Sequence, residues 1–128
     1  MTTKALFVVL VALVGLGGCA SDPIKEIQRV FQGKGEPQLQ AGIKHYDDGR
    51  YPQAARNFEA ALNEGLNQAG QVTAHKYLAF IHCVSKRERQ CRAHFNSALE
   101  IDPAFELGAA EAGHPMWGPV FRSVKARR

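Results

Sequence analysis

The residues of this 128-residue chain best suited to chemistry are its three cysteines and five histidines. Cys83 and Cys91 lie close in sequence to His82 and His94, and thiolate and imidazole groups are the usual ligands of zinc. The spacing lacks the Cys-x2-Cys and His-x3-His pairs of zinc sites, so we expect no metal. If the chain reaches an oxidising compartment, this cysteine pair favours a disulfide across one turn.

The third cysteine, Cys19, follows an apolar run that begins after a single charge, Lys4. The run is about a dozen residues, whereas a membrane-spanning helix needs roughly 20, so residues 1–18 fit a cleaved secretory signal. Leu16-Gly17-Gly18-Cys19 resembles the lipobox of bacterial lipoproteins. The resemblance implies cleavage between Gly18 and Cys19 and attachment of acyl chains, palmitate among them, to Cys19. The alternative is a plain signal peptide with an incidental cysteine.

The same resemblance implies a location for the mature protein. Ala20 stands where an aspartate would favour retention in the inner membrane, so we expect an outer-membrane anchor with the protein facing the periplasm. Loss of Lys4 lowers the formal charge from +4 to +3, and the excess lies in residues 86–92 and 125–128. These clusters are either solvated faces or contacts for anionic lipid, peptidoglycan or an acidic partner. We expect no nucleic acid partner.

Residues 19–37 read as a linker that contains one short amphipathic helix. Asp22 is suited to cap it and Pro23 to begin it. The apolar face comprises Ile24, Ile27, Val30 and Phe31. The glycines and proline of residues 33–37 should end the helix. We expect it to pack onto the following domain rather than lie on lipid, because a single short helix gains little alone.

A repeated pattern organises the next part of the chain. Ala54–Leu62 and Cys91–Leu99 both place a small residue, an aromatic residue, an alanine and a leucine at positions i, i+4, i+7 and i+8. These positions form one face of a helix whose small residues let a neighbour approach closely. Partner helices are expected over 38–47 and 72–84. The sequence therefore predicts a helical hairpin that occurs twice.

A repeated hairpin of this size is similar to the tetratricopeptide (TPR) family. Gly42 and Ala79 hold the small position of the first helices, and Gly49-Arg50-Tyr51 resembles the family's internal turn. The resemblance covers 38–113 and implies an all-α, short helical-hairpin solenoid of about two repeats plus a capping helix. The repeat of 37 residues exceeds the family's usual 34, and we expect an extended loop at 65–71 to absorb the surplus.

The ends of the two repeats are less regular. The second internal turn, residues 85–89, lacks the glycine and tyrosine of the first. A third repeat is expected to begin at 104–113 with its first helix alone, which caps the stack. Residues 114–128 then form a basic tail that contains prolines and a tryptophan. Trp117 either folds back to close the core, which we favour, or offers an exposed hot spot for a partner.

The TPR resemblance implies that a peptide or helix of a protein partner binds a groove formed by the first helices. Carrying the family's positions across gives the groove residues Ile43, Tyr46, Asp47, Lys76 and Phe80. The alternative is that part of this set packs in the core, because Ile43 and Tyr46 continue an apolar stripe that starts at Leu39.

No motif for a hydrolase, a haem or a phosphate loop occurs, so we expect no enzymatic activity and no cofactor. The expected function is an outer-membrane lipoprotein that serves as adaptor or assembly factor for an envelope complex, such as a secretion system or a pilus. The alternative is a structural, cell-wall-associated lipoprotein whose basic clusters contact peptidoglycan or lipid.

Overall fold

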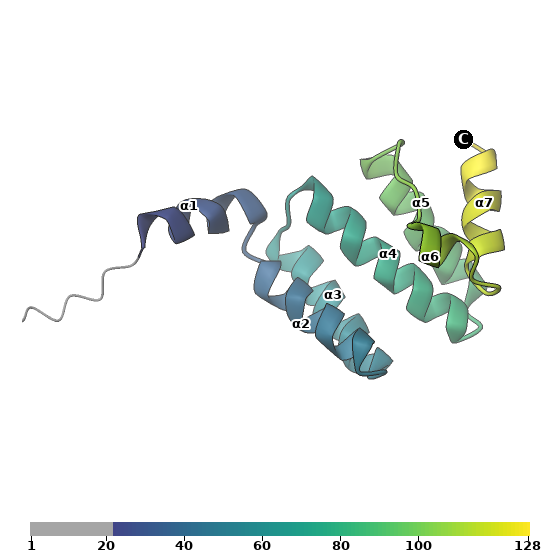
Figure 1. Cartoon of the computed structure of the whole chain (residues 1–128), viewed down its shortest axis with the longest axis horizontal. Helices are drawn as coiled ribbons and strands as arrows, with labels where there is room; N and C mark the ends of the chain where they lie inside the picture. Colours follow the sequence, from purple (N-terminus) through teal and green to yellow (C-terminus); the bar gives the residue numbers. More distant parts are fainter. Residues whose placement is uncertain (1–21) are drawn as a thin grey trace, which may run out of the picture.

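The computed structural model describes residues 22–128, and over that range the chain is all-helical, as predicted, with seven helices and no strand (Figure 1). The helices are α1 (Pro23–Gln32), α2 (Glu36–Asp47), α3 (Tyr51–Glu64), α4 (Gln68–Val84), α5 (Glu88–Ile101), α6 (Ala109–Ala112) and α7 (Gly118–Ala126). Within this range no helix is both long and apolar enough to cross a bilayer. The predicted cleavage and lipidation sites, Gly18 and Cys19, lie outside the described residues.

The body consists of two helical hairpins, α2–α3 and α4–α5, that stack side by side (Figure 1). Phe58 and Phe95 hold equivalent central positions and are completely buried. Close approach depends on small residues, since a Cβ added to Gly42 would lie 2.7 Å from the Phe58 ring. The repeated pattern in the sequence therefore places one aromatic ring at the centre of each hairpin.

The two internal turns have the same backbone shape although their sequences differ. Gly49 has φ 74° and Lys86, 37 residues later, has φ 60°. Their amides donate to the Tyr46 and Cys83 carbonyls at 2.9 and 3.1 Å. In both turns the next amide donates to the carbonyl five residues back at 2.8 Å. The second turn keeps the geometry of the first, with a lysine in the left-handed region that favours glycine.

The prediction of an extended loop at 65–71 was wrong, because only residues 65–67 separate α3 from α4. Asn67 caps α4, since its side-chain oxygen accepts a hydrogen bond from the Gly70 amide at 2.8 Å. Leu66 is buried in the core beside it. The additional residues of the repeat thus lengthen α4 to 17 residues instead of forming a loop.

The C-terminal part also differs from the prediction. The prediction of a helix over 104–113 was wrong, because residues 105–108 are non-helical and only the four residues of α6 form a helix. The extended segment buries Leu107, and the Asp102 carboxylate accepts a hydrogen bond from the Ala104 amide at 3.0 Å. Residues 114–128 are not a tail, since α7 packs on α5 and buries Val120, Phe121 and Val124 in the core (Figure 1).

Helix α1 projects away from the stacked hairpins (Figure 1). The expectation that its apolar face packs on the domain was wrong. Ile24, Ile27, Val30 and Phe31 are 57 to 76% exposed. Backbone hydrogen bonds tie only the end of the helix to the body: the Asn67 amide donates to the Gln32 carbonyl at 3.0 Å.

Candidate functional site

The structure brings part of the predicted groove together. The Tyr46 and Phe80 ring centroids lie 6.5 Å apart, and the Lys76 ammonium lies 5.7 Å from the Phe80 ring. Ile43 is only partly buried against the core, and Asp47 is exposed. Sequence reasoning missed Tyr77, whose ring centroid lies 4.8 Å from that of Tyr46. Its position three residues before Phe80, on the same helical face, was the available signal.

The C-terminal segment closes this groove. The Trp117 ring stacks on the Phe80 ring, with centroids 4.1 Å apart and an angle of 19° between the ring planes. Its Nε1 donates a hydrogen bond to the Glu111 carbonyl at 2.9 Å. The Glu111 carboxylate pairs with Lys76 at 2.7 Å. Phe80 is 2% exposed and Trp117 is 8% exposed. The assignment of Phe80 to a partner surface was therefore wrong, and of the two alternatives for Trp117 the structure adopts core closure.

The two tyrosines of this region are held neutral. Burial, followed by the neighbouring Tyr51, Tyr77, Glu111 and Asp47, raises the pKa of Tyr46 to about 12. Burial and then the Asp47 and Glu111 carboxylates raise the pKa of Tyr77. A phenol whose pKa is raised is a poorer proton donor and nucleophile at neutral pH. These rings therefore contribute packing and hydrogen-bonding capacity rather than acid–base chemistry.

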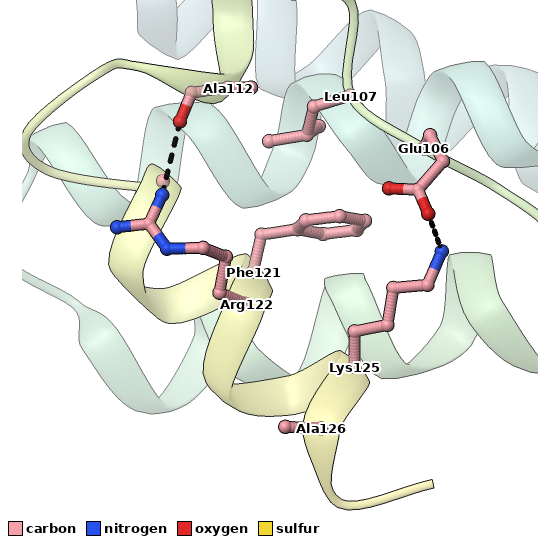
Figure 2. A pocket seen from close by; sticks show the side chains of 8 residues that line it. Glu106, Leu107, Ala112, Phe121, Arg122, Lys125 and Ala126 are labelled. Carbon is pink, nitrogen blue, oxygen red and sulfur yellow. Dashed lines mark hydrogen bonds and ion pairs between the residues drawn. The ribbon is translucent and has the colours of Figure 1, made fainter.

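A pocket of about 430 Å³ lies between α7 and the segment that leads into it (Figure 2). Its apolar lining comprises Leu107, Ala112, Phe121 and Ala126. Such a volume falls in the range of pockets that bind small ligands or a few side chains. Residues 114–128, predicted to be a tail, thus supply one wall of this apolar pocket.

Charged side chains flank the apolar lining on two sides (Figure 2). On one side Arg122 donates through one of its guanidinium nitrogens to the Ala112 carbonyl at 3.3 Å. On the other side the Lys125 ammonium pairs with Glu106 and donates to the Phe105 carbonyl at 3.0 Å. A guanidinium has five N–H donors, so Arg122 can bind a carboxylate while it keeps this contact.

Three histidines line the junction of α4 and α5. The Nδ1 atoms of His75 and His94 lie 3.0 Å apart, and the His82 ring stacks on His94 with centroids 5.2 Å apart. Burial, followed by the charges that His75 and His82 would carry, lowers the pKa of His94 to about 4. Burial also lowers the pKa values of His75 and His82. The cluster is therefore neutral at pH 7.

The two cysteines for which a disulfide was expected form one. Cys83 at the end of α4 and Cys91 in α5 are joined, with their Cα atoms 5.2 Å apart. The bond spans the second internal turn and lies in the core. The paired sulfurs supply no thiolate for a metal. Across residues 22–128 no group of three histidine, cysteine or acidic side chains has an arrangement that could hold a metal ion.

Comparison with protein-family models, with characterised proteins and with solved structures gives no match for this chain, so its site is assigned from its own residues and geometry.

Proposed function

We propose that this protein is an outer-membrane lipoprotein whose small TPR-type domain acts as an adaptor or assembly factor for an envelope complex of the secretion-system or pilus kind. The lipobox-like sequence that ends at Cys19 supports the anchor. The two hairpins, related residue by residue at a spacing of 37, support the repeat assignment. Because TPR-type units commonly bind peptides, the adaptor role agrees with this architecture.

The observation that carries the proposal is the pocket beside α7, rather than the groove predicted from sequence. Its apolar floor and flanking cations suit a partner segment that inserts one apolar side chain and places a carboxylate near Arg122. Lys125 is engaged with Glu106, so Arg122 is the cation better placed for a partner. The partner class is therefore an exposed protein segment with adjacent apolar and acidic residues.

The affinity that such a site can supply is modest. One apolar side chain buried in the pocket contributes about 1.5–3 kcal/mol, and a hydrogen bond to a charged group about 1.5–3 kcal/mol. Part of this gain offsets the entropy lost on association. A lipid anchor compensates, because tethering partners at one membrane raises their effective concentration. Anchor and pocket therefore act together in this proposal.

Two experiments test the two parts separately. Replacing Cys19→Ser should move the protein from the membrane fraction to the soluble periplasm, and continued membrane retention would contradict the anchor. For the pocket, Arg122→Glu should lower co-purification of an envelope partner with the full-length protein at least tenfold. Arg89→Glu, at an exposed position of α5, makes the same charge change as a control. Equal effects of the two variants would refute the pocket.

A further inference from the structure

The exposed side of α1 is the largest apolar feature that the core leaves uncovered in the described residues. Ile24, Ile27, Val30 and Phe31 are 65, 57, 76 and 74% exposed. Residues at this spacing share one face of a helix, and Lys25 lies on the opposite face. Apolar side chains of this size grouped on a surface indicate a binding surface rather than chance exposure.

Backbone contacts of the residues that follow α1 fix the direction of this helix. Gly33 has φ 95°, and a Cβ on it would lie 2.4 Å from the Gly65 carbonyl oxygen. A Cβ on Gly35 would lie 2.1 Å from the Ala61 carbonyl oxygen. The Gly35 amide donates to the Gly65 carbonyl at 2.8 Å. Two glycines thus allow a close backbone contact that holds the body against the end of α1 and leaves its apolar face free.

The position of Cys19 indicates what covers this face. Ile24 follows Cys19 by five residues, and an extended chain of five residues spans at most about 18 Å. An interfacial helix lies about 5–10 Å deep at the boundary between headgroups and acyl chains. An acylated Cys19 would therefore hold the first turn of α1 within reach of the lipid surface. This step rests on the lipidation in the proposed function.

We propose that α1 is an interfacial helix whose apolar face inserts into the phospholipid surface beside the acylated Cys19. A helix of ten residues binds a membrane weakly alone, but the anchor makes its insertion intramolecular. Helices α1 and α7 lie at opposite ends of the molecule (Figure 1). The stacked hairpins thus separate the inserted helix from the pocket beside α7, so lipid and a partner can be bound at the same time.

The test places a fluorophore on each face of α1 in the full-length lipidated protein. Val30→Cys reports the apolar face and Lys25→Cys the polar face. The disulfide occupies Cys83 and Cys91, so the introduced thiol is the labelling site. Each protein, labelled with a nitrobenzoxadiazole probe, is reconstituted into vesicles of phosphatidylethanolamine and phosphatidylglycerol. Flotation of the same vesicles reports the anchor independently.

We expect the Val30 probe to shift its emission to shorter wavelength and to be quenched at least threefold more than the Lys25 probe by spin-labelled lipid. Equal quenching in floating vesicles would overturn the interfacial helix and leave the anchor intact. Failure to float would remove the anchor, and the inference with it. In the Cys19→Ser form, concentration-dependent shielding of the Val30 probe without vesicles would assign the face to a second copy and also overturn the inference.

Discussion

Replacing Trp117→Ala should strongly destabilise the fold, because this residue closes the core. The substitution removes a ring that stacks on Phe80 at 4.1 Å and is only 8% exposed. It also removes the hydrogen bond from Nε1 to the Glu111 carbonyl at 2.9 Å. The Lys76–Glu111 ion pair lies in the same segment, so it loses its support as well.

The magnitude follows from these contacts. Truncating a buried tryptophan to alanine costs about 3–5 kcal/mol, because transfer and cavity terms add. Trp117→Phe keeps much of the stacking surface and loses the hydrogen bond, so it should cost less, about 1–2 kcal/mol. Small domains have a total stability of about 5–15 kcal/mol, so the alanine variant should remain measurable.

The assay is urea unfolding followed by helical circular dichroism, with the disulfide intact. Met116→Ala is the matched control, because its side chain is adjacent in sequence but 41% exposed, and it should change stability by less than about 0.5 kcal/mol. If Trp117→Ala lowers the free energy of unfolding no more than Met116→Ala does, then Trp117 does not close the core. That result would favour the alternative of an exposed hot spot.

Three further predictions concern stability, each measured by urea unfolding. Stability should fall as the pH drops from 6.5 toward 4. The pKa of His94 is lowered to about 4, so in this window the unfolded chain binds a proton that the folded chain does not, and His94→Gln should flatten the dependence. Lys86→Gly should stabilise the fold by up to about 1 kcal/mol, because it removes a lysine from the left-handed backbone region. Gly49→Ala, at the equivalent turn, should destabilise the fold by about 1 kcal/mol. Changes of the same sign for both variants would contradict the shared turn geometry. Replacing Cys83 and Cys91 together by serine should cost about 2.5 kcal/mol through loop entropy, and no loss would show that the bond does not constrain the unfolded chain.

The helical hairpins could be predicted because their signal is local and doubled. Phe58 and Phe95 sit in the same pattern of small residues, and both are completely buried at the centre of a hairpin. The internal turns follow, since helices that pack closely on both sides leave the connecting backbone little choice. Lys86 shows that this constraint outweighs local preference, because it adopts φ 60° without being a glycine.

The C-terminal part could not be predicted in the same way. Residues 104–113 have helical composition, but burial of Leu107 and the pairing of Glu111 with Lys76 depend on contacts far apart in sequence. The same contacts cover Phe80, so a groove assigned by repeat position alone was partly closed. The pocket beside α7 has no sequence signature, because its walls come from two segments that meet only in the folded chain.

Helix α1 was predicted correctly as an element and wrongly in its environment. Asp22 precedes the helix and caps it, because its Oδ1 accepts a hydrogen bond from the Ile24 amide at 3.3 Å. Amphipathic spacing reveals that one face must be covered, but not by what. The glycines at 33 and 35 decide the direction of the chain, and their role depends on the α3–α4 connection that they contact.

The most direct test of the adaptor proposal is photo-crosslinking in living cells from Ala126, an exposed residue that lines the pocket, in the full-length protein. Asn96, exposed on α5, serves as the control position. We predict that one envelope protein is captured from Ala126 and not from Asn96, through a peptide that contains adjacent apolar and acidic residues. No capture from Ala126, or the same capture from both positions, would contradict it.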